Sequence, residues 1–370
     1  MTVFLTDYRT VYNPQSELLD DVLYPQRVHW FSQLYAKKDT GLIYVPHKLA
    51  ERVLDPDLCK SLRDSAVGKR CAFILAAGNQ HFAGIYPKTF KRTRLTYDYK
   101  FLPLTLTQVY AGRIAQMVGA QDLVITDGCA CASSLKVMTD VRRLILDEGF
   151  ERVVVLAVED TINDMVLSFF GETGACLTLK EEETGIKPSA FDDTNHGFYI
   201  GQGAVLAVFE DEYTQRKPQA VLEGAGIASE KCSNAIGQNE DGEGFEKAIE
   251  EALEDSYMTP CDVSIVKAHG TGTLSNNLAE KSAIQRVFDE YVVTSYKQHI
   301  GHTMGASGLL ESCLLIDDIK GGVIPHIKGR TQADTVYLSE PKTITDRPAF
   351  ISLAAGMGNI YAAAIFNTNV

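Results

Sequence analysis

LVITDGCACASSLKVMTDVRRLIL (residues 123–146) passes from the pattern of a buried strand, through a turn of small residues, into the pattern of a helix. The apolar residues of its second part recur at helical spacing: Leu135, Met138, Val141, Leu144 and Ile145. Gly149 follows this run and suits the end of a helix. Strand, turn and helix in this order predict one unit of an α/β fold.

The same alternation runs along the rest of the chain. Further apolar runs typical of buried strands are AFILAAG (72–78), RVVVLAVE (152–159), AVLAVFE (204–210) and VSIVKAH (263–269). EYTQRKPQ (212–219) is a polar break, and AVLEGAGIAS (220–229) after it restarts the strand pattern opened by VFLTDYRT (3–10). We therefore expect a layered α/β fold with two related halves, at residues 1–211 and 212–370.

Composition and charge limit the classes of protein to which the chain could belong. The net charge of -13 over 370 residues does not favour a nucleic-acid partner. No apolar run approaches the roughly 20 residues that a membrane span requires, and the start of the chain lacks the pattern of a secretory signal. The 8 cysteines are scattered, which is typical of reduced thiols in a cytoplasmic protein. Apart from Cys129 and Cys131, we expect them to be small apolar core residues.

Three stretches place a reactive side chain among glycines and small residues: GCACASS (128–134), KAHGTGT (267–273) and KQHIGHTMGASG (297–308). Cys131 stands just before a helix, where unpaired amides and the helix dipole favour a thiolate and can hold an oxyanion. His269 ends a strand pattern, and His302 precedes a second turn and helix. One cysteine from the first half and two histidines from the second are expected to meet at strand ends.

Together these stretches resemble the elongating, Cys-His-His type of β-ketoacyl-ACP synthase, within the thiolase-like superfamily. CACASS (129–134) matches the family's TACASS motif, with Cys131 as the nucleophile and Cys129 at the usual threonine position. The other two stretches match the family's histidine motifs and give His269 and His302. The resemblance spans almost the whole chain and implies a thiolase-like α-β-α-β-α fold built from two pseudo-symmetric halves.

Other motifs match the family around this site. Lys297 and Glu311 stand where the family has a supporting lysine and glutamate, and Glu280 is kept after HGTGT. FDDTNHGFYIGQGA (191–204) and SLAAGMGN (352–359) match two further family motifs. The chain departs from the family pattern at His196, Gln202, Asn277, Met357 and Asn359. These departures keep the chemistry and bear on the substrate and its chain length.

The resemblance implies an acyltransferase that performs decarboxylative Claisen condensation of an acyl thioester with malonyl-ACP. Cys131 would carry the acyl group, and His269 and His302 would hydrogen-bond the malonyl thioester carbonyl. We expect no metal and no cofactor of the chain's own, because the 4'-phosphopantetheine arm belongs to the partner acyl carrier protein. The sequence does not choose among fatty-acid, polyketide and polyene pathways.

By the same resemblance, the backbone amides of Cys131 and Met357 form the oxyanion hole, Met357 gates the acyl pocket, and Leu106 is the candidate for the pocket floor. The strongest basic cluster, KTFKRTRLTYDYK (88–100), is a candidate docking face for an acidic carrier protein. The basic residues proposed for docking are Lys88, Lys91, Arg92 and Arg94. The expected assembly is a homodimer, or a heterodimer with a related ketosynthase or chain-length-factor chain.

Several alternatives were weighed against this interpretation. Cys129 and Cys131 with His299 and His302 could ligate zinc, although C-x-C is uncommon in zinc sites. A thiolase would have another catalytic cysteine near its C-terminus, beyond Cys313, and an initiating synthase would have Cys-His-Asn. A non-catalytic chain-length partner would lack the nucleophile. A ketosynthase-like acyltransferase, a malonyl decarboxylase and one subunit of a ketosynthase heterodimer stay open.

Overall fold

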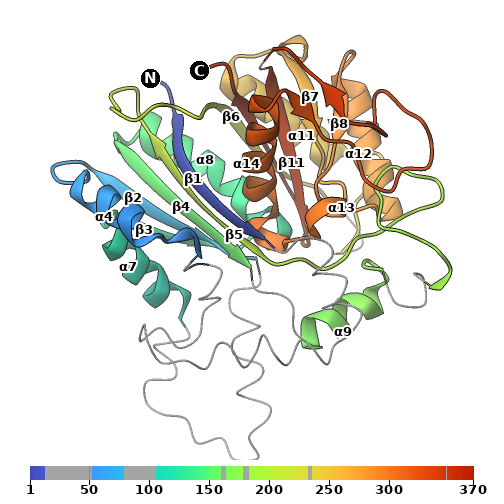
Figure 1. The fold of residues 1–370 in the computed structure, drawn as a ribbon, viewed down its shortest axis with the longest axis horizontal. Coiled ribbons are helices and arrows are strands. Elements are labelled where there is room, and N and C mark those ends of the chain that lie inside the picture. Colours follow the sequence, from blue (N-terminus) through green and yellow to red (C-terminus); the bar gives the residue numbers. More distant parts are fainter. Residues whose placement is uncertain are drawn as a thin grey trace, which may run out of the picture.

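The structure is a computed structural model that describes residues 1–12, 50, 52–78, 106–159, 164–177, 183–231, 236–346 and 348–370. Within these residues, a ten-stranded sheet in the order β3-β2-β4-β5-β1-β6-β12-β11-β7-β8 frames the molecule (Figure 1). Its strands are β1 (Phe4–Tyr12), β2 (Cys71–Ala76), β3 (Leu123–Asp127), β4 (Arg152–Glu159), β5 (Gly203–Glu210), β6 (Ala220–Ser229), β7 (Val263–Lys267), β8 (Val292–Thr294), β11 (Ala349–Gly356) and β12 (Ile360–Asn367). The strands expected from the sequence are all present.

The sheet consists of two halves with the same internal order. From the centre outward, the first half runs β1-β5-β4-β2-β3 and the second runs β6-β12-β11-β7-β8. In each half the inner two pairings are antiparallel and the outer two are parallel. Within the described part of the sheet, the two half-sheets pair through β1 and β6, at Phe4↔Val221 and Leu5↔Ala220. This repeat confirms the pseudo-symmetric fold, while the boundary at residues 211 and 212 stays a prediction.

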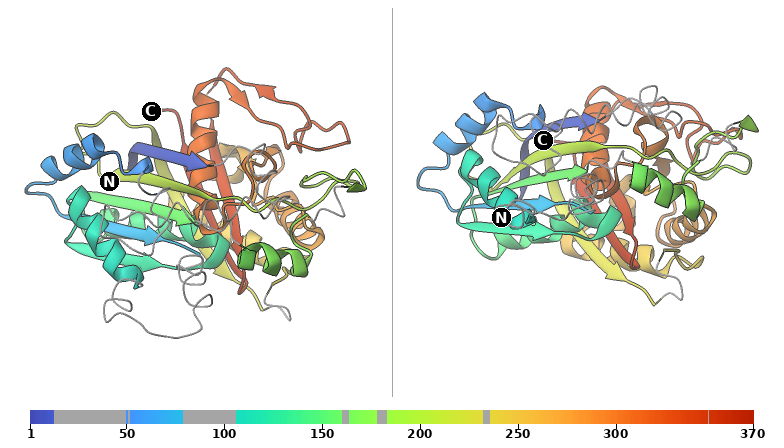
Figure 2. Two further views of the ribbon diagram at one scale, coloured as in Figure 1. Left: turned by 60° about the horizontal axis from the view of Figure 1, so that its bottom comes forward. Right: turned by 90° about the horizontal axis from the view of Figure 1, so that it is seen from below.

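Helices form three layers around the two half-sheets. α8 (Ser133–Leu146) and α14 (Ser307–Lys320) pack between the half-sheets, in one apolar cluster with residues from both. α4 (Pro56–Asp64) and α7 (Thr107–Val118) cover the outer face of the first half, and α11 (Glu243–Ser256) and α12 (Leu274–Val287) cover that of the second. Figure 2 shows the blue-to-green first half and the orange-to-red second half on opposite sides of the molecule. The layers are α-β-α-β-α, as predicted.

The remaining elements are short or lie beside the site. They are α9 (Asp164–Thr173), α13 (Lys297–Ile300), the 3-10 turns η1 (Ala130–Ala132), η2 (Pro260–Asp262) and η3 (Met304–Ala306), and the two-stranded sheet of β9 (Val323–Ile324) and β10 (Lys342–Thr343). Among the described residues, no helix is both long and apolar enough to cross a membrane.

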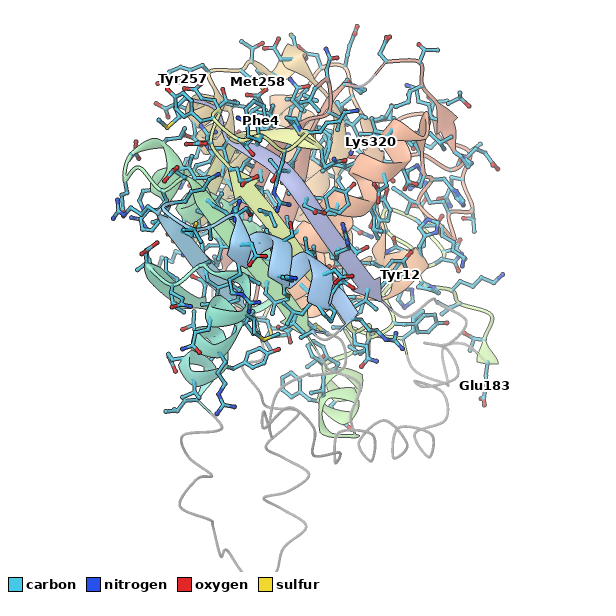
Figure 3. The ribbon with its side chains drawn as sticks, turned by 60° about the vertical axis from the view of Figure 1, so that its left-hand side comes forward. Phe4, Tyr12, Glu183, Tyr257, Met258 and Lys320 are labelled. Atoms are coloured by element: carbon cyan, nitrogen blue, oxygen red, sulfur yellow. The ribbon has the colours of Figure 1, made fainter. Side chains whose placement is uncertain are left out.

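A buried ion pair fixes the first half at its centre. Arg152 at the start of β4 donates to Glu210 at the end of β5 over 2.7 and 2.9 Å, and both side chains are 1% exposed. Thr6 of β1 also donates to Glu210, over 2.7 Å. β1 crosses the middle of the sheet from Phe4 to Tyr12 (Figure 3). The three strands are therefore tied by charge as well as by backbone pairing.

Two glycines let α11 lie directly on β6. A Cβ atom at Gly224 would overlap the carbonyl oxygen of Ala252, and one at Gly226 would overlap that of Ala248. The GAG sequence at 224–226 therefore serves helix–sheet packing, which explains these glycines without a nucleotide site.

We expect Gly226→Ala to lower the free energy of unfolding by about 2–3 kcal/mol, because the helix must move away from the strand. Gly112→Ala is the control: it lies within α7, and a Cβ there meets no atom within 4 Å. That change should raise stability by about 0.5–1 kcal/mol through helix propensity. Guanidinium unfolding of both variants checks this, and an unchanged Gly226→Ala protein would contradict the packing argument.

Candidate functional site

Cys131 lies on a sharp turn between β3 and α8. The turn is η1, and Ala130 adopts φ 47, a left-handed conformation that alanine rarely takes. Two glycines from other segments pack against this turn. A Cβ at Gly78 would lie 2.5 Å from the Ala130 carbonyl oxygen, and one at Gly356 would lie 2.5 Å from that of Cys129. The strained backbone is thus held in place by close packing from the segment after β2 and from the end of β11.

The second half repeats this turn with different chemistry. Met304 has φ 45, and η3 leads into α14 as η1 leads into α8. Gly305 stands where the first turn has Cys131, and a Cβ on it would overlap the backbone of Gly78. The missing side chain lets this turn lie directly against Gly78, and the two turns are in contact, with Cys131 Sγ 3.9 Å from Met304 Sδ. One site is therefore assembled from both halves.

The two predicted histidines meet beside this contact. His269 follows the end of β7, and His302 lies between α13 and η3. Their ring centroids are 5.6 Å apart at 83°, and both residues are buried. The His302 ring also packs edge-on against Phe198, at 4.9 Å. The structure thus gathers all three predicted catalytic residues around the junction of the halves.

An apolar cluster surrounds the Cys131 thiol. It consists of Cys131, Val166, Phe170, Cys176, Phe198, Ile200 and Met304, with Ala175 and Met357 packed against it. Phe170 and Phe198 are in edge-to-face contact at 6.4 Å. α9 therefore contributes to the site, which the sequence analysis did not anticipate because no motif marks it. The thiol is therefore enclosed by apolar side chains.

Glu280 holds the loop that carries His269. Its carboxylate accepts the backbone N–H of His269 and, over 2.9 Å, that of Gly270, and it also accepts Asn276 Nδ2 over 2.8 Å. From the other side, Gln298 Nε2 donates to the Gly270 carbonyl over 2.8 Å. The loop after β7 is thereby fixed, while the supporting role of Glu280 in catalysis stays a prediction.

Glu311 binds two lysines at once. Lys297 Nζ donates to its Oε1 and Lys267 Nζ to its Oε2, each over 2.9 Å, and all three side chains are fully buried. Ser307 Oγ also donates to Oε1. The structure thus places the predicted Lys297 and Glu311 in contact. Lys267 was missed, although its position at the end of a buried strand was a signal.

The charges around the histidines favour the neutral imidazoles. Burial is the main cause that holds the pKa of His269 and of His302 well below the usual value, and the positive charge of Lys297 acts in the same direction. A neutral imidazole carries one N–H and can donate one hydrogen bond. Each ring has a buried Nδ1 without a protein partner. The pair is suited to donate to a substrate oxygen.

The expectation of a thiolate favoured by the helix dipole is wrong for this state of Cys131. Burial raises the pKa of Cys131 to about 12; Lys297 lowers it and Glu159 raises it. The residue lies in η1, before α8 begins at Ser133, and removal from water outweighs the helix dipole. Burial likewise raises the pKa of Cys129 to about 11. The raised pKa therefore favours the protonated thiol of Cys131 at neutral pH.

Met357 lies in the turn between β11 and β12. Gly358 has φ 91 and Asn359 has φ 60, so both occupy the left-handed region, which asparagine tolerates better than most residues. Met357 packs against the cluster around Cys131, and its role as a gate stays a prediction. Leu106 is 45% exposed at the start of α7 and is not part of that cluster, so its place at the pocket floor stays a prediction. Lys88, Lys91, Arg92 and Arg94 lie outside the described residues.

The zinc alternative is not supported by the described part of the chain. His299 Nε2 lies 2.8 Å from the carbonyl oxygen of His326, in contact with another loop. Among the described residues, no group of three or more His, Cys, Asp or Glu is arranged to hold a metal.

Of the other cysteines, Cys59, Cys71, Cys176 and Cys313 are buried as expected. Cys261 is exposed, which corrects the expectation, and Cys232 is outside the described residues.

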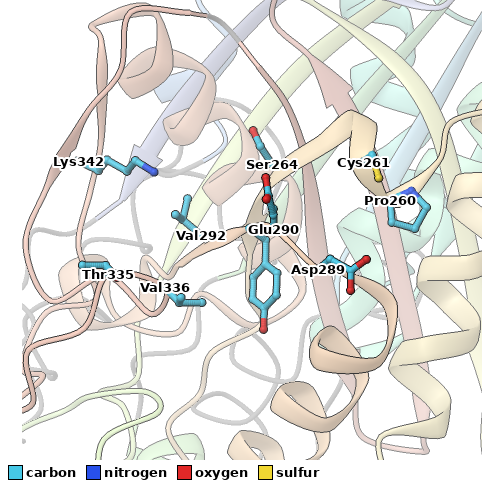
Figure 4. Close-up of a pocket in the computed structure, with 10 residues that line it drawn as sticks. Pro260, Cys261, Ser264, Asp289, Glu290, Val292, Thr335, Val336 and Lys342 are labelled. Carbon is cyan, nitrogen blue, oxygen red and sulfur yellow. The ribbon is translucent and has the colours of Figure 1, made fainter.

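A surface cavity of about 850 Å³ opens at the starts of β7 and β8 (Figure 4). Asp289, Glu290 and Lys342 give it a mixed, mainly acidic lining. His269 follows the opposite end of β7. The cavity is therefore separate from the catalytic constellation, which lies at the carboxyl ends of the parallel strands.

The sequence of this chain is similar to those of known proteins. Two family profiles match, "Beta-ketoacyl synthase, N-terminal domain" over residues 59–215 and "Beta-ketoacyl synthase, C-terminal domain" over residues 219–329. The oxytetracycline polyketide putative beta-ketoacyl synthase 1 of Streptomyces rimosus is 30% identical over 283 residues, which are 73% of this chain and 64% of that protein. The 3-oxoacyl-acyl-carrier-protein synthase 2 of Vibrio harveyi is 28% identical over 252 residues, 65% of this chain and 58% of that protein. The chain spans about three fifths of the length of these relatives.

Solved structures share the fold. One of them is described as a type II PKS acyl-carrier protein in complex with its ketosynthase. A chain of that structure matches with a TM-score of 0.78 at 17% identity, and the match covers 100% of this chain and 99% of that chain. A chain of the ishigamide ketosynthase/chain length factor has a TM-score of 0.72 at 18% identity, covering 100% and 99%.

The buried histidines predict how stability depends on pH. Because the pKa of His269 and of His302 is lowered in the folded state, the unfolded chain binds protons that the folded chain does not, once the pH falls below about 6.5. The contribution of the two neutral histidines to the free energy of unfolding is complete above that pH and is lost as the pH falls. Each histidine should add a slope of up to about 1.4 kcal/mol per pH unit to the free energy of unfolding.

Guanidinium unfolding between pH 7 and pH 5 measures this slope. The double variant His269→Gln/His302→Gln should flatten it, whereas His196→Gln, at an exposed position, should leave it as in the wild type. An equal slope in the wild type and the double variant would show that the two histidines are protonated in the folded protein.

Proposed function

The chain belongs to the β-ketoacyl synthase family, and from this we propose that it is a discrete β-ketoacyl-ACP synthase. The proposed reaction is decarboxylative condensation of an acyl thioester with malonyl-ACP, in fatty-acid, polyketide or polyene biosynthesis. One observation carries the proposal: a buried thiol, Cys131, shares an apolar cluster with Phe198, which packs on His302, and burial together with the charge of Lys297 lowers the pKa of His302 and of its neighbour His269. This arrangement supplies a nucleophile, Cys131, and two hydrogen-bond donors, His269 and His302, for different steps of the reaction.

The first half-reaction loads the acyl group on Cys131. Its sulfur attacks the carbonyl carbon of the acyl thioester, the C–S bond to the phosphopantetheine arm breaks, and the thiol proton leaves with the released arm. The backbone N–H groups of Cys131 and Met357 are proposed to hold the oxyanion that forms in between. The contact of Gly356 with the carbonyl of Cys129 supports this, because it brings the turn at Met357 against the nucleophile's turn.

The second half-reaction forms the new carbon–carbon bond. His269 and His302 donate hydrogen bonds to the thioester carbonyl oxygen of the malonyl group, and carbon dioxide leaves with cleavage of the bond to the α-carbon. Negative charge then moves onto that oxygen, where neutral donors stabilise it without giving up a proton. The α-carbon attacks the acyl-Cys131 carbonyl, and the cysteine sulfur is released. The chain's own residues need no metal for these steps.

We also propose an acyl carrier protein and a second ketosynthase-like chain as partners. The solved relatives described above were determined with an acyl-carrier protein in one case and as a ketosynthase/chain length factor in another. β3 is an edge strand, its residues are incompletely buried, and Val124 is 37% exposed, which suits pairing across a two-fold axis. The docking residues Lys88, Lys91, Arg92 and Arg94 stay a proposal, as does a cytoplasmic location.

Intact-protein mass spectrometry after incubation with a panel of acyl carrier proteins tests the nucleophile. The wild type should gain the mass of the acyl group, and Cys131→Ala should gain none, because the acyl-carrying sulfur is gone. Cys129→Ala should be loaded at a rate within about threefold of the wild type, since its thiol takes no part in the transfer. Acylation that persists in Cys131→Ala and disappears in Cys129→Ala would overturn the assignment.

A second experiment tests acyl selection by Met357. Methionine adapts its shape to an irregular chain, whereas phenylalanine is a rigid plate, so Met357→Phe should change the order of acyl preferences. Carbon dioxide release from malonyl-ACP should stay close to that of the wild type. Met117→Phe, at an exposed position of α7, is the control. The same ranking of acyl groups before and after Met357→Phe would exclude Met357 as the gate.

A further inference from the structure

The carboxylate of Glu311 has one more buried cation than it can neutralise. Each of its oxygens accepts a lysine, Lys297 on Oε1 and Lys267 on Oε2, and Lys267 also donates to the Leu353 carbonyl over 3.2 Å. Burial by itself would raise the pKa of Glu311, but Lys267 and Lys297 outweigh it and hold the pKa below its usual value. Burial lowers the pKa of Lys267, and Glu311 opposes this. The cluster therefore has two basic groups for one carboxylate.

We propose that Lys267 is a positioning residue that occupies the second oxygen of Glu311 and so leaves the positive charge of Lys297 uncompensated toward Cys131, His269 and His302. With Lys297 alone on Glu311, the pair would carry no net charge. Adding Lys267 changes the net charge of the cluster by one unit. Because the cluster is buried, neither water nor salt screens the effect as it would at the surface.

The groups that face the site agree with this role. For the Cys131 thiol they are Lys297 from α13 and Glu159 from β4, which act on its pKa in opposite directions. For the histidines they are Lys297, Lys267 and, for His269, the ring of His302, and all of them disfavour the imidazolium. Glu280 approaches His269 from the backbone side. An excess positive charge therefore favours both the thiolate that attacks and the neutral rings that donate.

A purely structural role for Lys267 is a poor explanation of the geometry. A buried lysine is costly to desolvate, and Glu311 already has Lys297 and Ser307 as partners. Packing alone would be served by an apolar side chain of similar length. The charge is what an apolar side chain could not supply.

The test measures the reactivity of the Cys131 thiol toward iodoacetamide, in a Cys129→Ala background and with Cys131→Ala as the blank. Below the pKa of a thiol, the alkylation rate follows the fraction of thiolate. Lys267→Met removes one positive charge, so the rate constant at pH 8 should fall by about tenfold or more, as for a rise of one pKa unit. This inference rests on the proposed function only in taking Cys131 as the nucleophile. The assay uses no carrier protein, so a failed condensation assay and a failed charge effect are distinguishable.

Two further variants separate charge from structure. Lys267→Met/Glu311→Gln has one lysine and no carboxylate, which restores the single excess charge while removing more contacts. Its alkylation rate should return toward that of the wild type. Lys267→Arg keeps the charge and should also stay near the wild type.

The proposal is overturned if Lys267→Met alkylates at the wild-type rate, or if the double variant is as slow as the single one. Should Lys267→Met not fold, Lys267→Gln removes the same charge with a polar side chain, and the same comparison with the double variant applies. Ser307→Ala is the matched structural control, because it removes a hydrogen bond to Glu311 without changing charge. A loss of rate in Ser307→Ala as large as in the charge variant would also reject the proposal.

Discussion

The carboxylate of Glu311, buried between Lys267 and Lys297, is the interaction on which the site depends. It joins the end of β7, the helix α13 and the helix α14, which carry or flank both histidines. Burying three charged groups is costly, and the arrangement is stable only because every charge has a close partner. Burial, together with the positive charges of Lys297 and Lys267, lowers the pKa of His269 and of His302 and so favours the neutral rings.

The internal repeat explains why a single site serves the whole chain. Both halves build a strained turn before a central helix, at Ala130 in one and at Met304 in the other. The first turn carries the thiol of Cys131, and the second has Gly305 at the same place. A side chain on Gly305 would overlap Gly78, so the second turn has no room for a reactive side chain at this position. Catalytic groups from distant parts of the sequence become neighbours through this contact.

Much of this could be predicted from the sequence, because it depends on local patterns. Strand and helix periodicity, the polar break and the motif residues gave the layers and the positions of Cys131, His269 and His302. What could not be predicted depends on distant segments. Lys267 is paired by a helix 44 residues further along, and the raised pKa of Cys131 comes from walls such as α9 that no motif marks. Cys261 is exposed because it lies in η2, a turn with no buried residue, which composition does not reveal.

The ¹⁵N NMR shifts of the histidine rings test the central claim most directly: that the site pairs a thiol with two neutral hydrogen-bond donors. The signals of His269 and His302 can be assigned with the corresponding glutamine variants in protein labelled at histidine. The account predicts that at pH 6 both rings show the separate nitrogen shifts of neutral imidazole. A ring that shows the two similar shifts of an imidazolium at pH 7 would contradict it.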